Sequence, residues 1–254
     1  MTPNKNIDLD RGLFPLAFSV FRANYLPCGV ASLLLLGSYV GAGYLVAPLA
    51  FAVFRSLIIM IVGYSAYRTL STGGRVSGFR AIGTGAGRIP WRYAGVMLMI
   101  LSPILILGIV WTAPGTGVGP SSIGEMAFGV MMVISYAALY VLFGTALPEV
   151  AERGDVSLAE AFERGRSNYR VIAKSMVIGP WLFRAGSMLF LILLSLAGVT
   201  VDLFHGATGV FQVAALGPML VFASCYIFAE VLTAIVLVRA YRRYPAAVPD
   251  AVAA

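Results

Sequence analysis

Long apolar runs, separated by polar and basic segments, dominate this sequence. Each run is close to the roughly 20 residues that a helix needs to cross a hydrocarbon layer of about 30 Å. Residues 26–67 are too long for one span, and the segment GAGYLVAP at 41–48 interrupts them with turn-forming residues. The pattern therefore predicts six transmembrane helices, near residues 24–43, 47–67, 93–112, 125–147, 172–199 and 210–238.

Composition agrees with this pattern. The chain is 59% hydrophobic and only 11% charged, whereas soluble domains carry about 25% charged residues. We expect an all-α, polytopic membrane fold that forms one domain over 1–254, with a flexible tail at 246–254. Glycine–proline pairs at 179–180 and 217–218 predict kinks in the last two spans.

The basic residues predict the orientation. They fall in the N-terminal arm, in the linkers between spans 2 and 3 and between spans 4 and 5, and after span 6, whereas the three opposite loops contain no lysine or arginine. The positive-inside rule places both termini and both linkers in the cytoplasm. The net charge of +7 then favours anionic lipid headgroups on that side as partners, and nucleic acid is not expected.

A short motif occurs twice before a span, as AFSVFRANY at 17–25 and AFERGRSNY at 161–169. The shared positions that we single out are Phe18, Arg22, Asn24 and Tyr25 in the first copy and Phe162, Arg166, Asn168 and Tyr169 in the second. A weaker third copy, GRIPWRY at 87–93, supplies Arg88 and Trp91. The repetition predicts three units of a cytoplasmic helix followed by a transmembrane hairpin, at about 1–72, 73–150 and 151–245.

On a helix, Phe18, Arg22 and Tyr25 lie on one stripe. Such a stripe suits a helix at the membrane surface, with its rings at headgroup depth and the guanidinium near phosphate. Two interpretations remain open at this point. The motif either contacts lipid headgroups or a partner protein, or it is an anchor that sets the angle of each hairpin. In the third unit, which contains the second copy, Ser157 predicts a helix cap, and Asp155, Glu160, Glu163 and Arg164 predict an exposed polar face.

The A-F-x-x-x-R-x-N-Y motif before a span, the repeated hairpins and the six spans resemble the bacterial glycerophosphodiester phosphodiesterase membrane-domain-like and YciC-like polytopic proteins. The resemblance implies an all-helical membrane fold in the bacterial cytoplasmic (inner) membrane. It carries no catalytic signature, and no segment outside the spans is long enough for a phosphodiesterase domain.

Three charged residues lie well inside predicted spans rather than at their ends, namely Arg55, Arg184 and Glu230. A charge near the bilayer centre costs at least about 2.5 kcal/mol and needs a partner. At 1.5 Å per residue, Arg184 lies roughly 15 Å beyond Lys174, and Glu230 lies about as deep before Arg239. We therefore predict a pair between Arg184 and Glu230, with Arg55 nearby. This layer is either a structural ion pair or a site that binds an anion or relays a proton.

Candidate chemistry is otherwise scarce. Cys28 and Cys225 are expected to be free thiols, and His205 with Asp202 is too small a set for a metal site. No nucleophile, phosphate-binding or metal motif is present, so we expect no enzymatic activity, no cofactor and no metal. The sequence favours a scaffold or accessory role that organises a membrane complex, through a membrane-protein partner, or the bilayer. The alternative is a transporter or lipid-handling protein that uses the polar layer.

Overall fold

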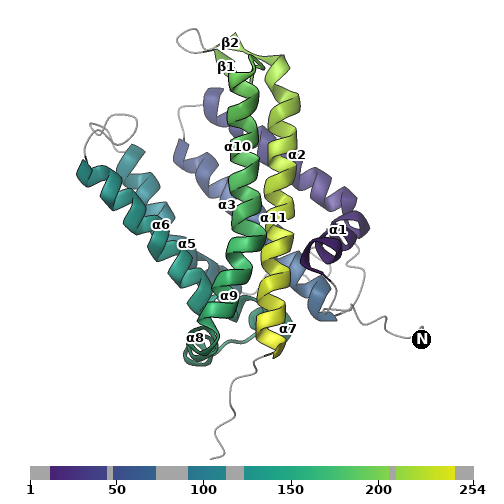
Figure 1. The fold of residues 1–254 in the computed structure, drawn as a ribbon, viewed down its shortest axis with the longest axis vertical. Coiled ribbons are helices and arrows are strands. Elements are labelled where there is room, and N and C mark those ends of the chain that lie inside the picture. The colour runs from purple at the N-terminus through teal and green to yellow at the C-terminus, as the bar shows by residue number, and fades with distance from the viewer. Residues whose placement is uncertain (1–11, 45–47, 73–90, 113–122, 206–209, 244–254) are drawn as a thin grey trace, which may run out of the picture. The chain divides into compact units, whose positions relative to one another are not determined.

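The computed structural model of this chain describes residues 12–44, 48–72, 91–112, 123–205 and 210–243 (Figure 1). Within these residues the protein is almost entirely helical. The exception is a short ladder in which β1 (Phe204–His205) pairs antiparallel with β2 (Val210–Phe211). The predicted all-α class is therefore confirmed.

Several of the described helices can cross a membrane. Four are long and apolar enough, over Val53–Leu70, Met126–Phe143, Tyr169–Leu196 and Val213–Arg243. A fifth candidate is the pair Leu13–Ala23 and Tyr25–Gly41, which is bent by 89°, and Trp91–Leu107 is a shorter apolar helix. The helices thus support a multi-pass membrane protein with four or five spans, and the count of six stays a prediction.

The chain divides into two compact units. The first contains Met1–Ile89 and Met176–Ile235, and the second contains Pro90–Ser175 and Val236–Ala254. This division does not follow the three predicted repeats, because the last repeat contributes residues to both units.

The first unit is built from α1 (Leu13–Ala23), α2 (Tyr25–Tyr44), α3 (Pro48–Thr72), α10 (Leu182–Leu196) and most of α11 (Leu216–Arg243). Helices α2 and α3 form the predicted hairpin, with Gly41 against the ring of Phe51. Their contact with α11 encloses an apolar core of Cys28, Ala31, Leu35, Ile58, Ala223 and Ile227. Figure 1 shows α10 and α11 side by side, with the β1–β2 ladder at the end where the chain passes between them.

The two glycine–proline pairs lie at different places in their helices. Gly179 and Pro180 lie in a π-helical turn, Val177–Trp181, between α9 and α10. A side chain at Gly179 would require the Leu13 side chain to shift, since its Cβ would lie 2.6 Å from Leu13 Cδ2. Pro218, in contrast, lies in the first turn of α11, where a helix tolerates proline because the first amides have no intrahelical partner. The kink expected within the last span at this proline is therefore wrong.

The second unit contains α5 (Trp91–Thr112), α6 (Ile123–Phe143), α7 (Ala146–Arg153), α8 (Leu158–Ser167), α9 (Tyr169–Met176) and the end of α11. Helices α5 and α6 pack along each other, and α6 also contacts α8. The fourth span was expected to continue to residue 147, but α6 ends at Phe143. Pro148 instead lies in the first turn of α7. The chain turns at Gly144, whose Cβ would lie 2.9 Å from Leu237 Cδ2.

Candidate functional site

The first candidate site is the polar layer in the first unit. Arg184 of α10 donates a hydrogen bond to Glu230 of α11 and forms an ion pair with it. The two side chains are 17% and 5% exposed. The contact predicted from the depths of the two residues is therefore present, and its role stays a prediction.

A row of phenylalanine rings aligns these two helices. Phe183 of α10 lies 5.0 Å from Phe228 of α11, and Phe21 and Phe14 of α1 extend the row on either side, at 5.6 Å from Phe228 and 6.4 Å from Phe183. Phe183 precedes Arg184, and Phe228 lies two residues before Glu230. The aromatic contacts thus fix the register in which the guanidinium and the carboxylate meet.

Arg55 of α3 is the third member of the predicted layer. Its guanidinium carbon lies 4.7 Å from the centre of the Tyr39 ring of α2, and its Nε donates to the backbone carbonyl of Phe51 at 3.3 Å. Arg184 stacks in the same way on Tyr226 of α11, at 5.0 Å. Each arginine therefore lies on a tyrosine, although only Arg184 has a carboxylate partner among the described residues.

Phe222 lies between the two tyrosines, with its ring 6.4 Å from that of Tyr39 and 6.3 Å from that of Tyr226. The pair of Arg184 with Glu230 is therefore present, whereas Arg55 lies on Tyr39 of the neighbouring helix, and the predicted meeting of all three residues stays a prediction. Sequence reasoning missed both tyrosines, because an aromatic residue in an apolar span carries no signal that separates it from ordinary packing.

The second candidate site is the pair of corners formed by the repeated motif. Asn24 lies between α1 and α2, where its side-chain amide donates to the carbonyl of Val20 at 2.8 Å. Its own carbonyl accepts from the amide of Cys28 at 3.0 Å. Asn168 makes the same two contacts between α8 and α9, with the carbonyl of Arg164 at 3.1 Å and the amide of Ile172 at 3.0 Å. Each asparagine therefore bonds to the last turn of one helix through its side chain and to the first turn of the next helix through its backbone carbonyl.

The two corners also share their pattern of exposure. Ala17 and Ala161 are fully buried, whereas Phe18, Arg22 and Tyr25 in the first copy, and Phe162, Arg166 and Tyr169 in the second, are all exposed. The predicted surface stripe is thus present in both copies. Arg88 of the third copy lies outside the described residues, and Trp91 is an exposed residue at the start of α5.

A small cavity lies beside the first corner. Its volume is about 50 Å³, and α1, α2, α3 and α11 contribute its walls. The lining is mostly apolar, with Asn24, Ser65 and Thr69 as polar members. Asn24, the corner residue of the first motif copy, thus lines this cavity together with residues of α2, α3 and α11.

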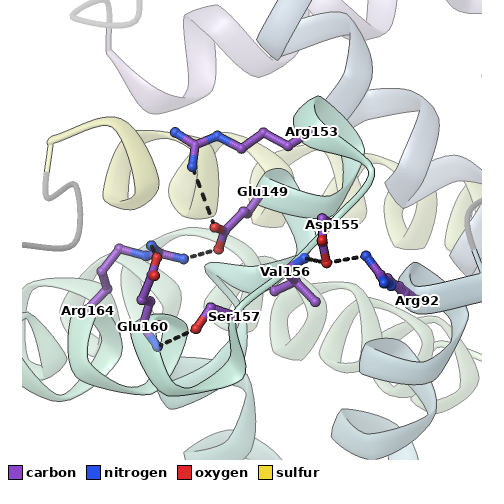
Figure 2. A network of polar contacts seen from close by, with 8 residues as sticks. All are labelled: Arg92, Glu149, Arg153, Asp155, Val156, Ser157, Glu160 and Arg164. Carbon is purple, nitrogen blue, oxygen red and sulfur yellow. Dashed lines mark hydrogen bonds and ion pairs between the residues drawn. The ribbon is translucent and has the colours of Figure 1, made fainter. Parts of the chain in front are cut away.

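The third candidate is a polar network in the second unit (Figure 2). Glu149 of α7 pairs with Arg164 of α8, and each side chain is only 4% exposed. Arg153 lies 3.9 Å from Glu149, Glu160 lies 3.7 Å from Arg164, and both of these outer partners are exposed. Arg164 also stacks on Tyr241 of α11, at 5.2 Å. The network links α7 to α8 through one buried carboxylate and one buried guanidinium.

The burial of Arg164 corrects the expectation that this residue is exposed. Arg164 was placed on the exposed polar face of its helix, but it is buried. The signal was present in the repeat, because Arg164 occupies the position of Val20, which is also buried. Glu149 was not singled out at all. The predicted cap is correct, since Ser157 Oγ accepts from the amide of Glu160 at 3.3 Å.

The loop between α7 and α8 carries a further contact. Asp155 accepts from the amide of Val156 at 2.7 Å and forms an ion pair with Arg92 of α5. The pKa of the Asp155 carboxyl is held below its ordinary value. The larger cause is the hydrogen bond from the backbone amide of Val156, and the second is the hydrogen bond from the Arg92 guanidinium. Because this carboxyl is exposed, solvent screens the contact and its contribution to stability is small.

The described residues contain no group of three or more His, Cys, Asp or Glu side chains that could hold a metal ion. No protein-family model, no curated protein and no solved structure matches this chain. The family resemblance drawn from the repeated motif therefore stays a prediction.

Proposed function

We propose that this chain is a multi-pass protein of the bacterial cytoplasmic membrane with a non-enzymatic scaffold or accessory role, organising a membrane complex or the bilayer. The observation that carries the proposal is the equivalence of the two corners. Each joins a short helix with one buried face to a following apolar helix through an asparagine with the same two hydrogen bonds. Each exposes the same phenylalanine, arginine and tyrosine.

The proposed topology has six spans in three hairpin repeats, with both termini in the cytoplasm. Its support is the distribution of the basic residues and the length of α5. That helix runs over 22 residues, Trp91–Thr112, which is enough to cross about 30 Å of hydrocarbon. The bent pair α1–α2 then supplies one span and a surface helix.

In this topology the two corners lie at the cytoplasmic headgroup layer. Arg22 and Arg166 then face anionic lipids, and the neighbouring rings lie at the depth that aromatic residues favour. A partner protein has a second surface available, because α10 exposes an apolar stripe of Leu182, Leu189, Leu193 and Leu196. Their spacing of seven, four and three residues places them on one helix face.

The lipid part of the proposal is tested in nanodiscs that mix phosphatidylglycerol with phosphatidylcholine. The variant with both Arg22→Gln and Arg166→Gln is expected to retain less phosphatidylglycerol in native mass spectrometry, with a loss of about 1 kcal/mol of attraction for each arginine. The matched control is Arg153→Gln, which removes an exposed charge outside both motifs. Equal retention by the double variant, the control and the unaltered chain would contradict the lipid contact.

The partner part is tested by gentle extraction from native membranes. A photo-crosslinking amino acid at Leu189 or at Phe162 is expected to capture one protein in stoichiometric amount, seen also as a complex in native mass spectrometry. The same amino acid at Leu35, a large side chain buried in the apolar core of the first unit, is the control and should capture nothing. A lone chain without preference for any lipid would overturn the scaffold role.

A second candidate function, in transport or lipid handling, is favoured by one specific observation. The polar layer contains two arginines and one carboxylate among the described residues, and this excess of positive charge suits an anionic ligand.

A further inference from the structure

We propose that Arg55 and Tyr39 form a binding site for one singly charged phosphate group inside the membrane-spanning part of the first unit. The phosphate is either the phosphodiester of a lipid or a soluble phosphate ion. This inference goes beyond the scaffold role, because it gives the chain a ligand of its own.

The first argument is charge balance. Arg184 and Glu230 form an ion pair and neutralise each other. Arg55 has no carboxylate within ion-pair distance among the described residues, since its contacts there are the carbonyl of Phe51 and the ring of Tyr39. The layer therefore carries one net positive charge within apolar helices. A charge at such a position is usually paired or functional, and one singly charged anion makes the layer neutral.

The second argument is the supply of hydrogen-bond donors. Arg55 uses Nε for the carbonyl of Phe51, which leaves its two terminal NH₂ groups without an acceptor among the described residues. The hydroxyl of Tyr39, whose ring Arg55 covers, is a further donor. The contacts of Arg55 among the described residues thus include no carboxylate. A donor-rich, positively charged place selects an oxyanion over a cation.

The third argument is the comparison of the two arginines. Arg184 lies on Tyr226 and directs its edge to the carboxylate of Glu230. Arg55 lies on Tyr39 in the same way, but no carboxylate of the described residues meets its edge. Stacking fixes the plane of a guanidinium and leaves its paired N–H groups available to two oxygens at once. The first unit thus contains two arginines stacked on tyrosines, of which Arg184 has a carboxylate partner and Arg55 has none among the described residues.

The position of Arg55 permits both sources of phosphate. It lies seven residues after Pro48, the first residue of α3, which is roughly 10 Å at 1.5 Å per residue. A lipid headgroup drawn inward by that distance, or a hydrated ion entering from the same side, reaches the guanidinium. The chemistry that recognises the two is the same, so the experiment has to separate them.

The experiment uses the full chain in two settings. In the first, delipidated protein in maltoside detergent is titrated with inorganic phosphate against chloride at constant ionic strength, and the unfolding temperature is measured. In the second, the chain is placed in nanodiscs of phosphatidylcholine with phosphatidylglycerol, and native mass spectrometry counts the retained phosphatidylglycerol. The variants are Arg55→Gln and Tyr39→Phe, and the charge-matched control is Arg170→Gln on the exposed side of α9.

We expect one setting to give a saturable response in the unaltered chain and in the control. Arg55→Gln should abolish it, and Tyr39→Phe, which keeps the stacked ring but removes the hydroxyl, should weaken binding on the order of tenfold. A response to phosphate in detergent identifies a soluble ion, whereas loss of retained phosphatidylglycerol identifies a lipid. Identical behaviour of Arg55→Gln and the unaltered chain in both settings would overturn the proposal.

Misfolding does not obscure this test. Without phosphate, Arg55→Gln removes an uncompensated charge from an apolar helix, so we expect its unfolding temperature to be equal to or above that of the unaltered chain. A lower value in the absence of phosphate would show that Arg55 has a structural partner in this chain, and would also count against the site.

Discussion

Glu149 and Arg164 form an ion pair in which each side chain is only 4% exposed, so the second unit encloses a carboxylate and a guanidinium together. Removal of one partner leaves the other charge buried. We expect Glu149→Ala to lower the free energy of unfolding by about 3 kcal/mol, measured by thermal unfolding in detergent. The control is Glu160→Ala, because this half-exposed carboxylate lies 3.7 Å from Arg164 and should contribute less than about 1 kcal/mol.

The double variant Glu149→Leu with Arg164→Met tests whether the pair is needed at all. Apolar residues of similar volume often replace a buried ion pair without loss of stability, and Val20 already occupies the position equivalent to Arg164. We expect a stability within about 1 kcal/mol of the unaltered chain. A loss as large as that of Glu149→Ala would mean that the pair has a role beyond filling this space.

The pair of Arg184 and Glu230 is tested by reversal of charge. Glu230→Arg places two guanidinium groups together inside the first unit, so we expect the protein to fail to accumulate in the membrane. Adding Arg184→Glu restores opposite charges and should restore accumulation, measured by immunoblot of membrane fractions. Failure of the exchanged pair to recover would show that the contact alone does not explain these two residues.

Gly165 of α8 lies directly against the backbone of Leu142 in α6, where a Cβ has no space. We expect Gly165→Ala to destabilise the second unit by about 1–3 kcal/mol, because the two backbones must separate. The matched control is Gly95→Ala in α5, where nothing lies within 4 Å of the added carbon. That change should stabilise the helix by about 0.5–1 kcal/mol. Equal effects of the two variants would argue against the close contact.

The contact of Asp155 with Val156 and Arg92 predicts a pH dependence. The pKa of this carboxyl is lowered from 3.8 in the folded protein. Its contribution is therefore fully present above the unfolded value and is lost as the pH falls through the lower folded value. We expect the carboxyl carbon of Asp155 in NMR spectra to stay in its ionised state below pH 3.8, with Asp155→Asn assigning the signal. Titration at or above 3.8 would contradict the contact.

Several features follow from the sequence because they depend on local order alone. An apolar run of about 20 residues in a membrane satisfies its backbone hydrogen bonds internally only as a helix, so the sequence predicts the starts of α2, α3 and α5 within a few residues. The cap at Ser157 depends on a residue only three positions away. The meeting of Arg184 with Glu230 was predicted because depth along a helix is a simple count of residues at 1.5 Å each.

Other features were decided only by the tertiary structure. Whether Arg164 faces water or Glu149 depends on how α8 is rotated, and that rotation is fixed by the approach of Gly165 to Leu142, 23 positions earlier. The place of Arg55 over Tyr39 depends likewise on the packing of α2 against α3. Sequence determines how deep a residue lies and which helix carries it. The partner that a buried side chain such as Arg164 meets is set by contacts with helices that are distant in the chain; the repeat signals that this position is buried, but it does not identify Glu149 as the partner.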